Sequence, residues 1–365
     1  MNIAIFTPNQ NPYSETFIQA HKNFLQGEIF YYYGRKHIQL EGKSSLSTSW
    51  ERNFLNLKRK LFKKSPNFIQ ETILLKSLNK NKIDVILVEY GTHAHFLLPL
   101  LKKAGLPFIV HFHGYDASVT KVIKAHNYYE EVFLSASKVI AVSRKMQEML
   151  LEMGCPPEKL IYNVYGPHPE FLEVEPKFSK KQFVAIGRFT DKKAPYYTIL
   201  AFKKAVENYP DIKLIMAGDG QLLNTCQNLV RHLNLEKQVE LLGVISPERY
   251  RELLSESLAF VQHSITANTG DMEGAPLAVL EASAAGIPVV STFHAGIPDV
   301  ILNGKTGLLC EEHDVAAMAE NMMALLADPD FSMKLGEAGK RNIKVHFSLE
   351  RHIATLQDIL IKITA

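Results

Sequence analysis

The sequence predicts an α/β fold with two Rossmann-like domains, each built on a parallel sheet. Short apolar runs alternate with helical patterns along nearly all of the 365 residues, as is typical of βαβ units. A chain of this length exceeds what one hydrophobic core usually holds. We therefore expect two domains, with ligands bound beyond the carboxyl ends of the strands, in a cleft between the domains.

The first domain is predicted over residues 1–168. Its strands are expected in the apolar runs NIAIF, DVILVEY, PFIVHF and KVIAVS. The segment GPHPEFLEVEPKFSK at 166–180 combines prolines with mixed charges, a composition typical of a linker. The series of strands is therefore expected to stop there and to start again beyond it.

The second domain is predicted over residues 178–347. Its strands are expected in FVAIG, KLIMAG, VELLG, LAFVQ and IPVVS, with a helix that starts near Ala194. The DPD at 328–330 places Pro329 between two helical patterns, which predicts a helix end and restart rather than a metal-binding motif. Apolar residues at helical spacing follow in FSLERHIATLQDILIKI, and this last helix, 348–365, is expected to pack back on the first domain.

The composition is that of a globular protein, with 46% hydrophobic and 22% charged residues. Residues 1–110 hold 15 lysines and arginines against 7 aspartates and glutamates, so the basic charge is concentrated there. This favours either an anionic partner such as a membrane surface or a solvated basic face. We find no finger motif and no aromatic-interleaved basic stripe, so no nucleic-acid partner is expected.

Targeting and redox features indicate a cytoplasmic protein. The N-terminus, MNIAIFTP, lacks a basic segment and is expected to form a strand rather than a signal peptide. The uncharged stretch from Ala282 to Pro298 is interrupted by glycines and prolines, so it is not expected to span a membrane. The three cysteines are widely spaced and include no CxxC pair, which indicates neither a disulfide framework nor a zinc site.

A basic segment, GRFTDKKAP at 187–195, follows a predicted strand and leads into a helix. A helix N-terminus offers unpaired N–H groups and the positive end of a dipole. Arg188 would add a bidentate fork and Lys193 a point charge, which together suit a diphosphate. Lys192 is the alternative to Lys193, and a surface helix start with solvated lysines is the alternative to a binding site.

Glycines and histidines mark two further strand ends. In AGDGQL at 217–222, the glycines either admit the backbone of a ligand or form a tight turn. HFHGYD at 111–116 and THAH at 92–95 each contain an HxH pair, so a metal site has to be considered. No cysteine or clustered carboxylate completes a familiar ligand set, so no metal is predicted. His113 is instead expected to be a polar group at the ligand site.

The segment DMEGAPLAVLE at 271–281 carries two glutamates. Pro276 suits the first position of a helix, which places Glu273 in the preceding loop and Glu281 ~7.5 Å further along the helix axis. Carboxylates with this offset suit two parts of a longer ligand better than the two sides of one bond. A sugar and a ribose joined by a diphosphate have about that reach.

These motifs together resemble the retaining glycosyltransferases of family 4, which have the GT-B fold of two Rossmann-like domains facing across a cleft. The resemblance covers nearly the whole chain and is carried by HGYD, GRFTDKK, GDGQL, EGAPLAVLE, AAGIPVVST and AGIPDVILNGKTGLL. The sequences SETFI at 14–18, FHGYDAS and TGDMEGAPLAVLEA are most similar to those of bacterial exopolysaccharide enzymes of the colanic-acid and amylovoran type.

The resemblance implies that the protein transfers a hexose from a UDP or GDP sugar to a saccharide or lipid-linked acceptor in surface polysaccharide biosynthesis. It implies retention, no metal and no other cofactor. Arg188 and Lys193 would hold the diphosphate and Glu281 the ribose, while Glu273 would face the transferred sugar and His113 would line the reaction centre. Backbone contacts to the donor are expected at Gly187, Gly218, Gly220, Gly274, Ala275, Pro276 and Leu277, and acceptor-side positions at Asp116 and His93.

Two positions depart from the family's pattern. The family often has a Gly-Gly pair after the first strand, whereas this chain has PNQNPYSE at 8–15. Backbone contact between this loop and the diphosphate is therefore not expected from the sequence. Ala194 stands where glycine is usual after the lysine.

A basic amphipathic helix is predicted in SWERNFLNLKRKLFKK at 49–64. Either it lies on an anionic membrane at the inner face of the cell membrane, or it packs on the first domain with solvated lysines. Its apolar positions are Trp50, Phe54, Leu57 and Leu61, and its basic positions are Arg52, Lys58, Arg59, Lys60, Lys63 and Lys64.

Two other functions suit the same fold. One is a phosphorylase or hydrolase, but the sequence shows neither a lysine identifiable as one that binds pyridoxal phosphate nor an opposed carboxylate pair. The other is a non-catalytic sugar-nucleotide binding protein. Such a protein would need Arg188 and Glu281 but neither His113 nor Glu273.

Overall fold

A computed structural model describes residues 1–11 and 15–364 of the chain, which forms two compact units. Part of the loop PNQNPYSE and the first residue of SETFI lie outside the described residues. Unit 1 comprises the described residues of Met1–Val142, Gln147–Asn163 and Ile353–Ala365, and unit 2 comprises Ser143–Met146 and Val164–His352.

Unit 1 is built on a seven-stranded sheet in the order β3-β2-β1-β4-β5-β6-β7. Neighbouring strands are parallel except for the edge pair of β2 and β3, which is antiparallel. The central strands β1 and β4 are buried almost throughout, which explains their continuous apolar sequence. The strands are β1 (Asn2–Thr7), β2 (Glu28–Tyr33), β3 (Gln39–Leu40), β4 (Val85–Glu89), β5 (Phe108–His111), β6 (Lys138–Ala141) and β7 (Leu160–Tyr162).

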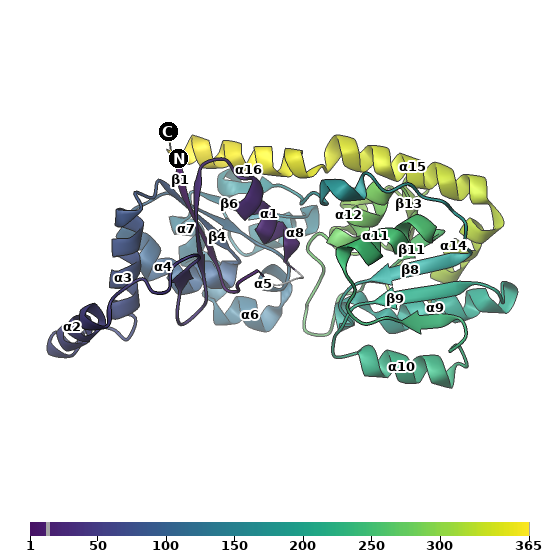
Figure 1. The fold of residues 1–365 in the computed structure, drawn as a ribbon, viewed down its shortest axis with the longest axis horizontal. Helices are drawn as coiled ribbons and strands as arrows, with labels where there is room; N and C mark the ends of the chain where they lie inside the picture. The colour runs from purple at the N-terminus through teal and green to yellow at the C-terminus, as the bar shows by residue number, and fades with distance from the viewer. Residues whose placement is uncertain (12–14, 365) are drawn as a thin grey trace. The chain divides into compact units, whose positions relative to one another are not determined.

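Helices connect the parallel strands of unit 1 (Figure 1). The C-terminal helix α16 (Leu349–Thr364) joins this unit from Ile353 onwards, and Gln357 in it accepts a hydrogen bond from the backbone N–H of Gln26 at 2.8 Å. The other helices are α1 (Thr16–Phe24), α2 (Ser49–Leu61), α3 (Phe68–Lys80), α4 (Gly91–Ala104), α5 (Tyr115–Ser118), α6 (Thr120–Ala125), α7 (Glu130–Ser135) and α8 (Arg144–Glu152), with 3₁₀ turns η1 (Asn127–Tyr129) and η2 (Pro157–Lys159).

Unit 2 is built on a six-stranded sheet in the order β10-β9-β8-β11-β12-β13, and all its pairs are parallel. This is the strand order of a dinucleotide-binding Rossmann fold, in which ligands bind where the order reverses, beside the first strand. Here that point lies between β8 and β11. The strands are β8 (Gln182–Ile186), β9 (Lys213–Ala217), β10 (Val239–Leu241), β11 (Ala259–Val261), β12 (Val289–Thr292) and β13 (Gly307–Cys310).

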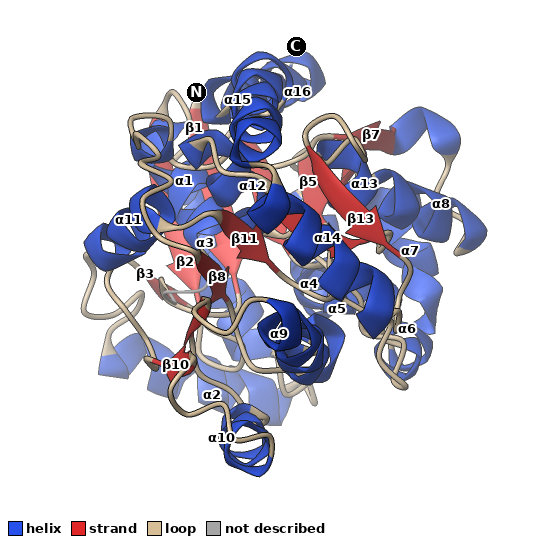
Figure 2. Ribbon diagram, turned by 90° about the vertical axis from the view of Figure 1, so that its right-hand side faces the viewer, coloured by secondary structure: helices blue, strands red, loops and turns tan. Residues whose placement is uncertain are grey.

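Helices again connect the strands of this second sheet (Figure 2). α14 ends at Ala327 and α15 begins at Pro329, so the predicted helix end and restart at DPD is confirmed. Asp328 caps α15 by accepting a hydrogen bond from the N–H of Phe331 at 2.9 Å. The helices are α9 (Pro195–Asn208), α10 (Leu223–His232), α11 (Pro247–Glu256), α12 (Leu277–Ala285), α13 (Ile297–Val300), α14 (Val315–Ala327) and α15 (Pro329–His346), with 3₁₀ turns η3 (Pro169–Phe171) and η4 (Asp191–Lys193).

Every predicted strand is present, but β2, β3, β7 and β13 were not predicted. β3 and β7 are very short, and β2 reads EIFYYY, an aromatic run rather than a β-branched one. The predicted linker 166–180 belongs to unit 2. There the ring of Phe171 packs on that of Tyr250 at 5.3 Å, and Lys340 donates to the carbonyl of Val174 at 2.8 Å.

Helix α2 carries the predicted amphipathic segment (Figure 1). Leu55 is its buried residue, and the helix packs against α3. The predicted apolar positions remain exposed: Trp50 by 76%, Phe54 by 54%, Leu57 by 65% and Leu61 by 72%. Within the described ranges, no helix is both long enough and apolar enough to cross a membrane.

Candidate functional site

The predicted donor residues of unit 2 gather beyond the carboxyl ends of its strands. Lys193 ends the turn η4, and its Nζ lies 3.2 Å from Glu273 Oε1 and 3.2 Å from Gln262 Oε1. Gln262 directly follows β11, the neighbour of β8. Gly187 leaves room for the lysine, because a Cβ there would lie 3.0 Å from Lys193 Cδ. The structure thus brings Gly187, Lys193 and Glu273 together.

Lys192, the alternative to Lys193, is buried in the same network. Its Nζ lies 3.0 Å from Asp271 Oδ1 and donates to the carbonyl of Met272 at 3.1 Å. It therefore ties η4 to the loop that precedes Glu273. Sequence reasoning missed Asp271 and Gln262, although both adjoin predicted elements.

The loop between β8 and α9 carries two more of the singled-out positions. Arg188 is exposed, and its guanidinium makes no hydrogen bond or ion pair with any described residue. Ala194 is buried in the left-handed region at φ +35°, just before α9 begins at Pro195. Because this region favours glycine, the geometry explains why glycine is usual at this position in the family.

The Glu273 carboxylate is buried yet ionised. Burial acts to raise its pKa, but the charges of Lys193 and Lys192, with a contribution from His294, lower it to about 2. The backbone N–H of Glu273 donates to His294 Nε2 at 3.1 Å, and His294 Nδ1 lies 2.6 Å from Glu312 Oε1. No motif marked His294 or Glu312 in the sequence, yet they anchor the loop that carries Glu273.

Backbone donors are available where this loop enters α12. The helix begins at Leu277, one residue later than predicted, because Pro276 is extended, at φ −71° and ψ 109°, and occupies the capping position. The N–H groups of Gly274, Ala275, Leu277 and Ala278 donate to no acceptor in the described ranges. Unpaired N–H groups at a helix N-terminus suit an anion.

Glu281 is the fifth residue of α12 and is also buried. Burial raises its pKa to about 7, although a hydrogen bond from Tyr250 and the charge of Lys193 act to lower it. Tyr250 comes from α11, and its hydroxyl oxygen also lies 3.3 Å from the carbonyl oxygen of Ala278. The two glutamates of the motif therefore differ at neutral pH. Glu273 is ionised, whereas Glu281 is near the midpoint of its titration.

The glycines of GDGQL form a tight turn against the loop after β8. A Cβ at Gly218 would lie 1.9 Å from the carbonyl oxygen of Gly187, and one at Gly220 would lie 2.5 Å from that of Phe189. The N–H of Phe189 donates to the carbonyl of Asp219 at 2.9 Å. Close approach of two backbones therefore accounts for both glycines.

In unit 1, His113 lies just beyond the carboxyl end of β5, beside the end of β4. Its Nε2 lies 2.8 Å from Oε2 of Glu89, the last residue of β4, and the Nδ1 of His21 from α1 lies 2.7 Å from Glu89 Oε1. The ring of His113 also packs against that of Tyr90, with 4.5 Å between centroids. Glu89 and His21 were not predicted. The position of Glu89 at the end of a predicted strand was a signal for it.

Asp116 shapes the turn that carries His113. Its carboxylate accepts hydrogen bonds from the backbone N–H groups of His113 and Gly114, each at 3.0 Å, and from that of Gly91 at 2.9 Å. The side chain is completely buried. Asp116 thus ties the HGYD turn to the start of α4, and its predicted place on the acceptor side stays a prediction.

His93 and the histidine pairs are arranged differently from the metal site that was considered. His93 is 3% exposed in α4, and burial, together with the charge of Arg35, lowers its pKa to about 3. In the described part of the chain, the residues that could hold a metal are His21, Glu89 and His111, whose ligand atoms lie within 4.8 Å of one another. His93 is not among them.

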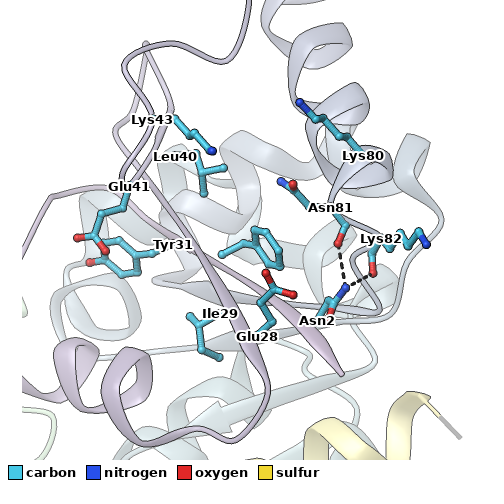
Figure 3. A pocket seen from close by; sticks show the side chains of 11 residues that line it. Asn2, Glu28, Ile29, Tyr31, Leu40, Glu41, Lys43, Lys80, Asn81 and Lys82 are labelled. Atoms are coloured by element: carbon cyan, nitrogen blue, oxygen red, sulfur yellow. Dashed lines mark hydrogen bonds between the residues drawn. The ribbon is translucent and has the colours of Figure 1, made fainter.

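A shallow hollow of about 520 Å³ opens at the other end of the unit 1 sheet (Figure 3). Asn2 and Glu28, the first residues of β1 and β2, line it together with Lys80 and Lys82. Glu89 and His113 lie at the carboxyl ends of the strands, where parallel sheets bind their ligands. The hollow is thus separate from the candidate site.

Comparisons with known proteins identify the family. Residues 169–342 match the family model for glycosyl transferases group 1, and residues 39–163 match the model for glycosyltransferase family 4. The colanic acid biosynthesis glycosyltransferase WcaL of Escherichia coli is 28% identical over 321 residues, which cover 84% of this chain and 78% of WcaL. The amylovoran biosynthesis glycosyltransferase AmsK of Erwinia amylovora is 30% identical over 281 residues, which cover 75% of this chain and 68% of AmsK.

The fold is also found in solved structures. The crystal structure of HepE from Anabaena in complex with UDP has a TM-score of 0.79 to this chain and 14% sequence identity. The match covers 99% of this chain and all of HepE. The family models, the relatives and the fold agree with the resemblance seen in the motifs. The chain therefore belongs to the family 4 (group 1) glycosyltransferases and has the two Rossmann-like units of the GT-B fold.

Proposed function

We propose that the protein transfers a hexose, with retention, from a UDP or GDP sugar to a saccharide or lipid-linked acceptor of a bacterial surface polysaccharide. The Lys193–Glu273 pair beside the unpaired N–H groups of Gly274, Ala275, Leu277 and Ala278 carries this proposal. The names of WcaL and AmsK, which refer to exopolysaccharides, support the pathway, and the UDP complex of HepE supports a nucleotide donor.

The leaving diphosphate is proposed to bind where positive charge and backbone donors meet. Lys193 and the exposed Arg188 supply the charge, and the start of α12 supplies N–H groups. Hydrogen bonds and charges aimed at a leaving group stabilise the transition state, and here they would do so without a divalent ion. Glu281 would accept hydrogen bonds from the ribose hydroxyls.

We propose that the anomeric configuration is retained because the acceptor attacks the same face from which the phosphate leaves. The bond from the anomeric carbon to the phosphate oxygen breaks while the acceptor oxygen bonds to the same face of that carbon. The leaving phosphate takes the acceptor's proton, so no carboxylate nucleophile is needed. Glu273, which its lysine neighbours keep ionised, would accept hydrogen bonds from the sugar hydroxyls. His113 is proposed to orient the sugar or the acceptor.

A thermal-shift screen against UDP, GDP, ADP and their sugars tests the donor site. One nucleotide should raise the melting temperature of the wild type. Lys193→Ala should reduce that shift, because a charge-assisted hydrogen bond contributes about 1.5–3 kcal/mol. Lys180→Ala is the matched control, since Lys180 is an exposed lysine of unit 2 paired with Glu256. If no nucleotide stabilises the wild type, the proposed function is wrong.

Contact with an anionic membrane is proposed for helix α2. Its exposed apolar side chains are flanked by Lys58 and Lys60, and Lys63 and Lys64 follow the helix, all of them exposed. An amphipathic helix of this kind binds at the boundary between headgroups and acyl chains, and each basic residue near an anionic surface contributes about 1 kcal/mol. A lipid-linked acceptor would be met at the same surface.

Trp50 provides a direct test, because it is the single tryptophan of the sequence. Its emission should shift to shorter wavelength with vesicles containing phosphatidylglycerol, and the protein should float with them, but not with pure phosphatidylcholine vesicles. Replacing the four lysines by glutamine should weaken binding by about 4 kcal/mol, close to a thousandfold.

The double variant Lys121→Gln/Lys124→Gln, in exposed positions of α6, is the control and should bind like the wild type. Unchanged emission and no flotation with anionic vesicles would contradict the membrane proposal. A blue shift that appears without vesicles and grows with protein concentration would instead indicate that α2 pairs with a second copy.

A further inference from the structure

Glu89 occupies the centre of a buried hydrogen-bonded cluster in unit 1. Its side chain is completely buried. Glu89 is the last residue of β4, so it lies at the carboxyl ends of the strands, as His113 does. One carboxylate oxygen lies 2.7 Å from His21 Nδ1 and the other 2.8 Å from His113 Nε2. The side chains of His21 and His113 are 0% and 3% exposed. Glu89 therefore connects helix α1 to the HGYD turn.

The chemistry of this carboxylate determines which ring nitrogens carry hydrogen. Burial acts to raise the pKa of Glu89, but the interactions with His21 and the hydrogen bonds from both histidines outweigh it and hold the pKa well below its usual range. An ionised carboxylate only accepts hydrogen bonds. At both short contacts the histidine must therefore donate, from Nδ1 of His21 and from Nε2 of His113.

We propose that Glu89 is the positioning residue of His113. It fixes the ring's orientation and keeps a proton on Nε2, while His21 holds the second carboxylate oxygen in place. The tautomer of a histidine is set by the partner of one ring nitrogen, and so is the hydrogen-bonding character that the other nitrogen presents. The relevance of Glu89 to catalysis rests on the proposed function, in which His113 orients the sugar or the acceptor. The hydrogen-bonded arrangement itself exists without substrate.

A metal ion held by His21, Glu89 and His111 is the competing explanation. Ligand atoms around tetrahedral zinc are about 3.3 Å apart, given bonds of about 2.0–2.1 Å. His111 Nδ1 lies 3.7 Å from Glu89 Oε2, which such a site would permit. The contacts of Glu89 with His21 and His113, at 2.7 and 2.8 Å, are instead hydrogen-bond distances. The geometry thus favours protons between these atoms.

Nitrogen NMR of histidine-labelled protein tests the tautomers without substrate. Signals are assigned with His113→Gln and His21→Gln. In the wild type, His113 should show a proton on Nε2 and His21 one on Nδ1. Glu89→Gln keeps the shape but offers one acceptor oxygen and one donor NH₂ group. At least one of the two rings must then change its tautomer or lose its bond.

Glu71→Gln is the matched control, since Glu71 is a buried glutamate of unit 1 that pairs with Lys103 in a different place. It should leave both tautomers unchanged. Wild-type tautomers that persist in Glu89→Gln, or a stoichiometric metal in the purified protein that is lost in this variant, would overturn the proposal.

Kinetics separate positioning from folding. With the sugar nucleotide identified by the thermal-shift screen, Glu89→Gln should lower kcat at least tenfold. Nucleotide affinity by calorimetry should stay as in the wild type, because the proposed nucleotide contacts all lie in unit 2. Reduced affinity together with a broadened melting curve would point to misfolding and overturn the assignment. If no nucleotide binds the wild type, the proposed function is wrong. The NMR measurement of the tautomers still tests the role of Glu89 independently.

Discussion

Glu281 is expected to make nucleotide binding tighter as the pH rises from 6 to 8. In the free protein, burial raises the pKa of this carboxyl to about 7. Ribose hydroxyls would donate to the ionised form, so binding requires the proton to leave. The apparent dissociation constant should therefore fall about tenfold between pH 6 and pH 8, and protons should be released on binding.

The same shift has a consequence for folding. In the unfolded chain this carboxyl has its ordinary pKa of about 4.5, so between that pH and 7 the folded state binds more protons than the unfolded state. The contribution of Glu281 to stability is complete below pH 4.5 and is lost as the pH rises through 7, in total about 3 kcal/mol. Glu281→Gln should remove this pH-dependent loss.

Calorimetry with UDP-glucose and GDP-mannose, whose phosphates do not titrate in this range, provides the measurement. Among the residues that the structure describes, the charged or titratable side chains that act on Glu281 are Tyr250 from α11 and Lys193 from η4. Burial raises the pKa of Tyr250 well above its usual value, so Tyr250 stays protonated throughout. Equal affinity at pH 6 and pH 8 in the wild type, or the same pH dependence in Glu281→Gln, would refute the reasoning.

Two further predictions concern the loops around Lys193. Lys193→Ala should slow turnover ten- to hundredfold, as expected for about 1.5–3 kcal/mol of lost stabilisation, and unchanged steady-state kinetics with the true donor would remove Lys193 from the site. Gly218→Ala should destabilise unit 2 by about 1–3 kcal/mol or more, because its Cβ would lie 1.9 Å from the Gly187 carbonyl oxygen. Gly304→Ala, at φ +73° with open space around it, should cost less in chemical denaturation, and equal losses would argue against the backbone contact.

Much of the fold could be predicted because buried parallel strands are continuous apolar runs. The strands that begin at Asn2, Val85 and Gln182 have this pattern. β2 was missed because its tyrosines resemble a surface segment, and only its pairing with β1 reveals it as a strand. Glycine and proline residues within the motifs likewise indicated where the chain leaves a strand.

Residues of the candidate site were predictable where each belongs to a short motif of its own. Lys193 and Glu273 come from separate motifs, each legible alone, and the strand order brings them together. Glu89 and His21 had no motif of their own. They are 68 residues apart, and their contact depends on packing between α1 and the end of β4, which no local pattern encodes. The raised pKa of Glu281 likewise arises from burial, which spacing does not reveal.

The membership of α16 in unit 1 affects the order in which the chain is completed during synthesis. Leu356 and Leu360 are completely buried, yet they leave the ribosome after all of residues 164–352. The amino-terminal unit therefore lacks part of its core until the carboxyl-terminal unit has been fully translated. In a chain that folds as it emerges, the unit that begins first is the one that matures last.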